Sequence, residues 1–541
     1  MTKLLYFLSF LSLTSCVSVE KYNAHIDEKI DVDKLRNDVD IVKNKLLKKQ
    51  VDIDLYYSKN VLSNRLDSFK NSIQQPMKPN DFSRELSKVV STFGHGHTVV
   101  MSLNKRATKE ERKKYKDSKG PFSQLEIKSF DNHLYLNTNY SKDSTLVEKA
   151  EILAINGVNY SDFYQLYHDY RKGDGYIKTL NKYMLSGAFL RYVNNEIGIV
   201  DSVELKMQKN DSIFTQIVKR EFKKKKVKKD DNLTKKDSVA DQPKIVKEVK
   251  KLTKEEKNRK KDLEKYKSDV KKYFVYNKIR NDYQREIIFP NKEDSTTAIL
   301  QIKTFSLRHS KKAYPFIFDS INKLKVKNLI LDLRNNGGGY VSDANYLYSF
   351  LTTTNQPKAV MADKMKVNSK FSVTENLFNK LGYIGNTIGL PFALYHYSKT
   401  LFNTKKEKDG NYYYKATNKK DLLNQPKKYQ GNIYVLTNGM SYSATCILGA
   451  ALQNEGKAVF VGEETGGDYN GTVAGSFADF KLKNAKIGVF YGLLDFKPNT
   501  SRELKGRGII PDVAIETNFN DIVNEKDPQL DWILNDIKTK K

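Results

Sequence analysis

The sequence predicts an α/β protein in which a helical region and a strand-rich region precede the main core. In the C-terminal half, strand-like runs such as NLILDLR and NIYVLTN alternate with helix-like runs such as AYPFIFDSINKLK. This alternation is typical of a largely parallel sheet that helices cover on both faces. At 541 residues the chain exceeds the size of one ordinary core, so several domains are expected.

The N-terminus has the features of an export signal. MTKLLYFLSFLSLTSC combines a short basic start with an apolar run that is too short to span a bilayer, and it ends at Cys16. The stretch LTSC resembles a bacterial lipobox, which implies that residues 1–15 are a lipoprotein signal peptide and that Cys16 carries the lipid. An ordinary signal peptide is the alternative. We therefore expect an extracytoplasmic protein anchored to a bacterial membrane, on the periplasmic face or at the cell surface. With Cys16 acylated, Cys446 has no partner, so no internal disulfide is expected.

Residues 16–110 are predicted to form a helical N-terminal region. Apolar residues recur three or four positions apart in KLRNDVDIVKNKLLKKQ, NVLSNRLDSFKNSI and NDFSRELSKVVSTF. The region ends in FGHGHTVVM, where two histidines among glycines precede a β-branched run. Because glycine interrupts the helical pattern, a loop that leads into a strand is expected there.

Residues 118–218 are predicted to form a strand-rich module with a helical insertion. LEIKSF, HLYLNT, EILAI and DSVELKM read as strands, and Asn210 and Asp211 lie at a hairpin turn. The strand, the INGV turn and the following helix resemble PDZ-like modules, with the insertion at about 160–198. A Gly-Leu-Gly-Phe carboxylate-binding loop is missing, which argues against peptide capture by this module.

A basic segment, residues 219–275, accounts for much of the excess positive charge. The net charge is +30, and about 23 Lys or Arg against about 11 Asp or Glu lie between 219 and 272. Few aliphatic residues and no glycine occur in this stretch, which is typical of a solvated insertion. An arm that binds anionic surfaces is the alternative. No nucleic-acid-binding motif accompanies the segment, so no nucleic-acid partner is expected.

Residues 276–520 are predicted to form the main α/β core. Residues 355–430 interrupt its strand and helix alternation with a stretch rich in Lys, Asn, Tyr and Phe, which we interpret as a lid or cap. Residues 521–541 are left as a C-terminal tail.

Two neighbouring strand-to-helix turns of this core carry residues suited to acyl transfer. NLILDLRNNGGGYV places three glycines after a buried strand, where backbone N–H groups could point at a negative oxygen. SYSATCILGAALQNEG places Ser441 and Ser443 at the start of a small-residue helix, where the positive end of the helix dipole lies. The alternatives are a tight glycine turn and a serine that only caps the helix.

Four motifs in order, LILDLRNNGGG, the serine helix, VGEETGG and GRGIIPDV, resemble the carboxyl-terminal processing and tricorn-type serine peptidases. The resemblance covers roughly residues 60–520 without the basic segment. It implies a crotonase-like (ClpP/crotonase) α/β core preceded by a PDZ-like module. It also implies that Ser443 is the nucleophile, with Gly338 and Ala444 as oxyanion donors.

The family uses two kinds of general base. In the processing branch a lysine follows the strand after the serine helix, but Asp468 occupies that position here. In the tricorn-like branch a histidine in a segment resembling D-G-H-T is the base, which implies His97. His95 stands where an acidic residue is common, and Gly96 stands where an orienting serine is expected. A histidine, with a pKa near 6.5, suits proton transfer from serine at neutral pH.

A carboxylate should orient the histidine, and the resemblance points to Glu503, just before GRGIIPDV. Glu463, Glu464 and Asp468 are the alternatives. A metal-binding His-x-His pair is a further alternative, but no third ligand stands in a recognisable motif, so no metal is expected.

Together these features predict a serine endopeptidase that hydrolyses peptide bonds of proteins or peptides through an acyl-enzyme. No cofactor is implied, and the sequence does not indicate an oligomeric state. The rival interpretations are a non-catalytic peptide-binding or scaffold lipoprotein that retains the peptidase fold, and a surface protein whose basic arm binds anionic polymer.

Overall fold

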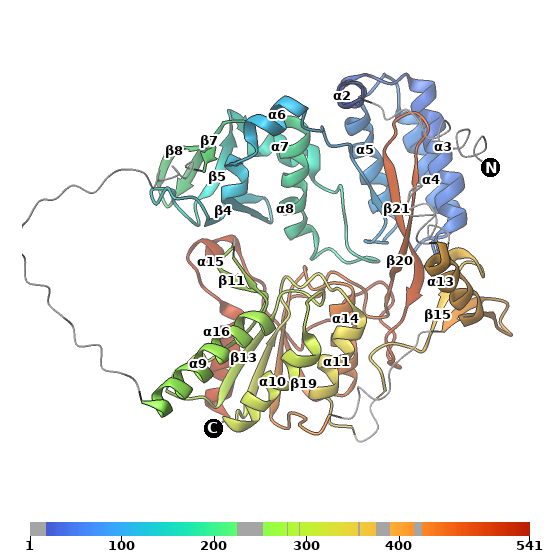
Figure 1. Cartoon of the computed structure of the whole chain (residues 1–541). Coiled ribbons are helices and arrows are strands. Elements are labelled where there is room, and N and C mark those ends of the chain that lie inside the picture. Colours follow the sequence, from blue (N-terminus) through green and yellow to red (C-terminus); the bar gives the residue numbers. More distant parts are fainter. Residues whose placement is uncertain are drawn as a thin grey trace, which may run out of the picture.

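The computed structural model describes residues 18–223, 253–278, 280–291, 293–354, 358–374, 390–415 and 425–540. The predicted signal peptide, Cys16 and residues 224–252 of the basic segment lie outside these ranges. Within them, no helix is long and apolar enough to cross a membrane. Figure 1 shows a strand-rich module, an N-terminal group of helices beside a long hairpin, and an α/β core below both.

The core is a six-stranded sheet in the order β12-β13-β14-β18-β19-β22. Its strands are β12 (Arg285–Ile288), β13 (Thr297–Ile302), β14 (Asn328–Asp332), β18 (Asn432–Thr437), β19 (Ala458–Gly462) and β22 (Val513–Ala514). All neighbouring pairs are parallel except β12 with β13. The predicted parallel sheet is therefore confirmed, and the carboxyl ends of its central strands lie at one edge.

Helices cover both faces of this sheet. One face is packed by α10 (Ser310–Lys323), α11 (Val341–Leu351) and α14 (Ala444–Asn454), whose apolar residues form one large buried cluster with the strands. On the opposite face, α16 (Pro528–Thr539) buries Ile533 and Ile537 against β13, β14, β18 and β19. Residues 521–541, which the sequence predicts to be a C-terminal tail, thus contain a helix that completes the core. A short helix, α15 (Phe519–Val523), precedes it.

The N-terminal helices pack against a long β-hairpin from the C-terminal half. The helices are α2 (Val19–Asp27), α3 (Val32–Lys49), α4 (Lys59–Ser72) and α5 (Pro79–Ser91), of which the periodicity predicts the last three. Their buried residues form one cluster with the hairpin of β20 (Thr472–Lys481) and β21 (Gly488–Phe496). At the hairpin turn, the buried carboxylate of Asp38 accepts from the Ala485 N–H at 2.7 Å.

The same hairpin belongs to a second six-stranded sheet, in the order β1-β21-β15-β17-β16 with β20 beside β21. Its other strands are β1 (Val99–Val100), β15 (Lys364–Val367), β16 (Thr404–Lys406) and β17 (Tyr412–Lys415), and helix α13 (Leu390–Asn403) precedes β16. In the part that the structure describes, the predicted cap (355–430) therefore adds strands β15, β16 and β17 to this sheet.

The module contains the third six-stranded sheet, in the order β3-β4-β5-β7-β8 with β6 beside β5. Its strands are β3 (Leu125–Phe130), β4 (His133–Asn139), β5 (Glu151–Ile155), β6 (Val158–Asn159), β7 (Ser202–Lys209) and β8 (Ser212–Lys219). Helices α7 (Tyr160–Tyr167) and α8 (Asn181–Tyr192), the latter continued by a π-helical turn at Val193–Ile197, bury one face of the sheet. The hairpin predicted around Asn210 is confirmed, because β7 and β8 pair in register.

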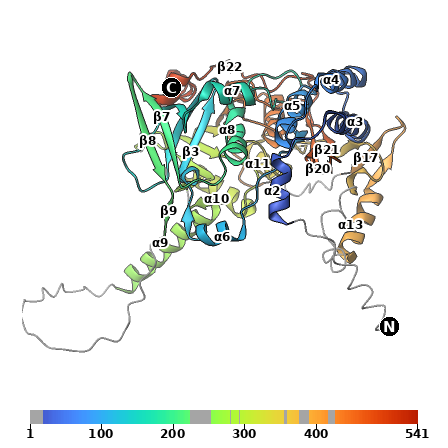
Figure 2. The ribbon, with the colours of Figure 1, turned by 90° about the horizontal axis from the view of Figure 1, so that it is seen from above.

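Shorter elements join these parts. They are α6 (Lys109–Tyr115), β2 (Ser118–Lys119), a 3-10 turn at Pro121–Gln124, β9 (Glu221–Phe222), α9 (Lys254–Tyr273), β10 (Tyr276–Asn277), β11 (Asp282–Tyr283) and a 3-10 turn at Ser372–Thr374. Helix α9 projects from the core beside α10, as Figure 2 shows from above.

Candidate active site

Three loops meet where β14, β18 and β19 end. The loop after β14 carries the three glycines, the loop after β18 carries both serines, and the loop after β19 carries the TGGD stretch. The Tyr442 N–H donates to the Asn336 carbonyl at 3.0 Å, and the Gly466 N–H donates to the Ser441 carbonyl at 3.0 Å. Backbone bonds thus fix the serine loop between its two neighbours.

Ser443 has a backbone conformation that few non-glycine residues adopt. It precedes α14 as the N-cap residue with φ 58° and ψ −121°, and its side chain makes no capping bond. Such a conformation costs about 1–3 kcal/mol for a residue with a Cβ and persists only where the surroundings impose it. The side chain is partly exposed, and its hydroxyl has no hydrogen bond within the described part of the chain.

Ser441 has a structural environment. It is fully buried, and its hydroxyl donates to the Leu333 carbonyl at 2.9 Å and accepts from the Asn438 N–H at 3.1 Å. These bonds connect the ends of β14 and β18, so Ser441 braces the loops rather than capping α14. The hydroxyl has no remaining proton to donate, which leaves Ser443 as the free one of the two.

The glycine loop lies directly against Ser443. A Cβ added at Gly338, where φ is +95°, would stand 2.9 Å from both the Ala444 nitrogen and the Ser443 Cβ, so only glycine fits. The Gly338 N–H donates to the Asn336 side-chain oxygen at 2.9 Å and is therefore engaged inside its own loop. The Ala444 N–H, at the start of α14, has no acceptor among the described residues and remains free to bind an anion.

Asn336 escaped sequence reasoning. Its side chain is fully buried, accepts from Gly338 as above and donates to the Ile302 carbonyl at 2.9 Å. Its own carbonyl also accepts from the Thr445 hydroxyl at 2.9 Å. Asn336 therefore connects β13, the glycine loop and the start of α14. The only signal in the sequence was an Asn-Asn pair before three glycines.

His97 lies next to the serine loop but is not hydrogen-bonded to it. Its ring centroid is 5.0 Å from that of Tyr442 and 5.7 Å from that of Phe477. Its buried Nε2 has no hydrogen-bond partner in the described ranges. Burial, with a smaller contribution from the Arg171 guanidinium, lowers the pKa of His97 to about 4. The imidazole is therefore neutral near pH 7 and able to accept a proton.

Asp174, which sequence reasoning missed, joins the histidine loop to the serine loop. It lies between α7 and α8, and its Oδ1 accepts from the Gly96 N–H at 2.9 Å and from the Tyr442 hydroxyl at 2.6 Å. Its Oδ2 is buried and unpaired within the described residues. Burial raises the pKa of Asp174 to about 6, while the bonds from Tyr442 and Gly96 oppose that rise. Glycines on both sides of an aspartate within a helical stretch were the only signal in the sequence.

His95 is turned away from the site. Its ring nitrogen Nε2 is 3.1 Å from the Ile53 carbonyl, and its ring packs 5.3 Å from that of Tyr56. Burial lowers its pKa to about 4. Within the described ranges, no group of three or more His, Cys, Asp or Glu side chains is arranged to hold a metal ion.

None of the four candidate orienting acids has a hydrogen bond or ion pair to His97 in the described part of the chain. Glu503 is exposed and has no recorded hydrogen bond or ion pair there. Glu463 accepts from the Tyr183 hydroxyl at 2.8 Å, and Glu464 pairs with the Arg507 guanidinium at 2.8 Å. Asp468 accepts from the Tyr56 hydroxyl at 2.8 Å and from the Gly506 N–H at 2.9 Å. The latter three carboxylates brace neighbouring loops.

Acyl transfer requires a nucleophile, a base and donors for the oxyanion. The site offers a strained serine at a helix N-terminus, a neutral histidine beside it and a glycine loop against it. The protein is a serine peptidase. Residues 296–515 match the model of Peptidase family S41. No curated protein matches the chain.

Solved structures show the same fold over most of the chain. Mature CPAF complexed with lactacystin has a TM-score of 0.53 and 14% identity, with 94% of this chain and 98% of that chain covered. An alanine variant of CPAF has a TM-score of 0.51 and 14% identity, with coverage of 91% and 95%. At such low identity the likeness concerns the fold.

Proposed function

We propose that the protein is an extracytoplasmic, lipid-anchored serine endopeptidase that cleaves proteins or peptides through an acyl-enzyme at Ser443. The observation that carries this proposal is the positive φ of Ser443 at the start of α14. A strained backbone that presents a free hydroxyl beside unpaired N–H groups has no evident structural purpose, whereas a nucleophile needs it.

In the proposed mechanism, the Ser443 hydroxyl attacks the substrate carbonyl while His97 accepts its proton. The Ala444 N–H stabilises the oxyanion together with N–H groups of the glycine loop. Gly337 and Gly339 are the loop members whose N–H groups have no acceptor in the described residues, and Gly338 would join them by leaving Asn336. His97 then protonates the leaving amine, and a water it activates hydrolyses the acyl-enzyme.

The base and the nucleophile must approach each other for this reaction, because they are not hydrogen-bonded in the present structure. Catalytic hydrogen bonds often tighten only when substrate binds. Glu503 remains our proposed orienting acid. It is exposed and precedes the GRGIIPDV segment, so a movement of its loop toward His97 is required.

For the architecture, we propose that the core is crotonase-like and that the module of β3 to β8 is PDZ-like. The alternating parallel sheet supports the first assignment, and the strand, turn and helix formed by β5, β6 and α7 support the second.

For the location, we propose that Cys16 is the lipid anchor. Metabolic labelling with a clickable fatty acid should mark the wild type and not Cys16→Ser, and the variant should leave the membrane fraction. Equal labelling of both proteins would refute the anchor.

The proposed chemistry is tested with a fluorophosphonate probe, which reacts with activated serine hydroxyls. We expect labelling of the wild type, no labelling of Ser443→Ala, and labelling of Ser441→Ala if that variant folds. Peptide mapping of the labelled protein identifies the modified residue. Label on Ser441, or equal labelling of Ser443→Ala, would mean that the nucleophile is misassigned.

The second candidate is a non-catalytic peptide-binding lipoprotein. The observation in its favour is the unpaired Nε2 of His97, since a permanent separation from Ser443 would abolish catalysis. Cleavage of an unfolded protein by the wild type but not by Ser443→Ala excludes it. Binding of peptides without cleavage or fluorophosphonate labelling would support it.

A further inference from the structure

A large cavity lies between the module and the core. Its volume is about 810 Å³, and β3, β4 and α8 form the module wall. The core wall comes from the turn after β10, from β13, from the loops that follow β14 and β18, and from α15 and α16. Glu126, Lys128 and Phe130 alternate along β3, so all three side chains face the same side and line the cavity.

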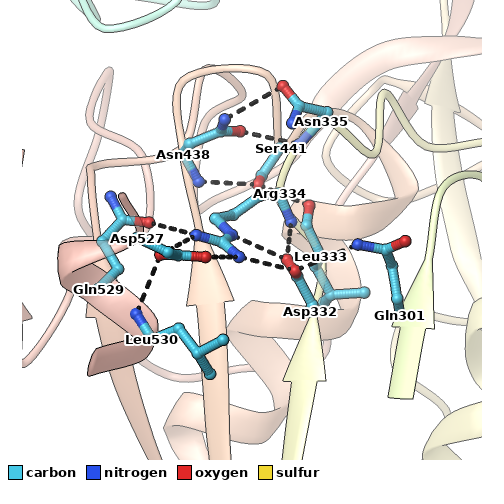
Figure 3. A network of polar contacts seen from close by, with 10 residues as sticks. All are labelled: Gln301, Asp332, Leu333, Arg334, Asn335, Asn438, Ser441, Asp527, Gln529 and Leu530. Carbon is cyan, nitrogen blue, oxygen red and sulfur yellow. Dashed lines mark hydrogen bonds and ion pairs between the residues drawn. The ribbon is translucent and has the colours of Figure 1, made fainter. Parts of the chain in front are cut away.

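Two of the four cations in this cavity are fully engaged. Arg334 forms a two-pronged contact with Asp332 and another with Asp527, at 2.8 to 3.0 Å, which Figure 3 shows. Lys303 is bonded to Asp282 at 2.8 Å. Their charges are neutralised in place, so neither is available to a ligand.

Lys128 and Arg280 are not engaged in this way. They share one carboxylate, Glu126, at 3.8 Å and 3.7 Å, which is beyond hydrogen-bond distance. Glu126 itself accepts from the Asn137 amide at 2.7 Å. In the described part of the chain neither cationic group makes a hydrogen bond, so two cations face one already bonded anion.

The environment of Lys128 shows this excess of positive charge. Desolvation is the largest effect and lowers the pKa of Lys128. The Glu126 carboxylate opposes this shift, while the positive charges of Lys149, Arg280 and Lys303 lower the pKa further. The side chain is nevertheless 43% exposed, because it projects into the cavity rather than into packed protein. An anion entering the cavity would be attracted to this point.

Two residues that line the cavity lie close in sequence to the candidate active site. Asn335 and Met440 line the cavity, and these residues belong to the loops that carry the glycines and Ser443. Three residues of chain span at most about 11 Å, so Met440 lies within that distance of Ser443. A substrate whose chain continues from Ser443 past Met440 would enter the cavity within a few residues.

We propose that Lys128 and Arg280 form a carboxylate-binding subsite that selects peptides with an acidic group a few residues from the scissile bond. The carboxylate is either an Asp or Glu side chain or the C-terminus of the peptide. The inference rests on the proposed peptidase function, whose substrate class it narrows. Arg and Lys with unpaired donors are suited to this recognition.

The test uses fluorogenic peptides that differ only at one position distal to the cleaved bond. One series varies a position before the cleaved bond and a second series varies a position after it. At that position Glu, Gln and Lys are compared, and each peptide is made with a free and with an amidated C-terminus. For wild type we expect kcat/KM to be about three- to tenfold higher with the carboxylate than with its neutral counterpart. The free and amidated sets distinguish a C-terminal carboxylate from a side chain.

Lys128→Gln, Arg280→Gln and the double variant should lose this preference and leave cleavage of the amidated Gln peptide unchanged. Lys206→Gln is the matched control, because Lys206 is an exposed lysine of the same module outside the cavity. Fluorophosphonate labelling should be equal in all variants. An undiminished acidic preference in the double variant, or no preference in wild type, overturns the subsite.

A binding measurement keeps the subsite testable if no peptide is cleaved. Fluorescence anisotropy on Ser443→Ala compares the labelled Glu peptide with the Gln peptide and a free with an amidated C-terminus. The peptide that carries the recognised carboxylate should bind more tightly, with a difference that falls as salt rises. Absence of fluorophosphonate labelling in wild type refutes the peptidase function. Equal binding in both comparisons refutes the subsite alone.

Discussion

Replacing Ser443 by glycine should stabilise the protein relative to replacement by alanine, although both changes remove the hydroxyl. Ser443 has φ 58° and ψ −121°, where a Cβ costs about 1–3 kcal/mol and glycine is relaxed. Glycine also gains about 0.4–1 kcal/mol of conformational entropy in the unfolded chain, which opposes the effect. The expected net gain of Ser443→Gly over Ser443→Ala is therefore about 0.5–2 kcal/mol.

The measurement is thermal unfolding of the two variants side by side, followed by near-UV circular dichroism. A rise of about 2–4 °C in melting temperature per kcal/mol is expected for a unit the size of the peptidase domain. Ala450→Gly is the control, since this residue lies in the buried middle of α14 and glycine should cost about 1 kcal/mol there. Equal stability of Ser443→Gly and Ser443→Ala would show that the serine loop is not strained.

Further outcomes concern the reaction. Ser443→Ala and His97→Ala should each lower kcat/KM by several orders of magnitude, and the double variant should be little worse, because nucleophile and base act as a unit; single-variant assays on one fluorogenic peptide measure this. Burial lowers the pKa of His97 to about 4, so a pH profile of kcat/KM should stay constant down to about pH 5 and decrease below it. A histidine with an ordinary pKa would instead give a decrease near pH 6.5. Asp174→Asn keeps an acceptor for Gly96 and Tyr442, so its kcat should stay within about tenfold of wild type. Asp174→Ala removes the acceptor, and its kcat should decrease by a larger factor than its KM changes. Equal kcat in the two variants would exclude a positioning role for Asp174.

The sheet and the candidate nucleophile were predictable because their signals are local. A buried strand followed by glycines, or by a serine and small residues, is readable within a dozen positions. The choice of Ser443 over Ser441 came from a resemblance, and the geometry now gives a physical reason, since Ser441 is buried and bonded at both ends.

Asp174 and Asn336 could not be predicted, because their roles depend on contacts between distant segments. Nothing in RKGDGY indicates that its carboxylate meets the hydroxyl of Tyr442, which lies in the other half of the chain. The cavity cations show the same limit, since Lys128 and Arg280 meet only when the module lies over the core. The amino-acid composition gives the net positive charge of the chain but not which cationic side chains lack a hydrogen-bonded partner.

The β1-to-β21 pairing has a consequence for how the protein is made. The strand that follows His97 can pair only when residues 488–496 exist, and the N-terminal helices complete their buried cluster only with the same hairpin. A growing chain therefore contains the candidate base long before the structure that holds it in place. Peptidase activity should therefore appear in a single step, after nearly the whole polypeptide has been synthesised and has folded. A peptidase assembled in this order has no partly finished form able to cut its own emerging chain.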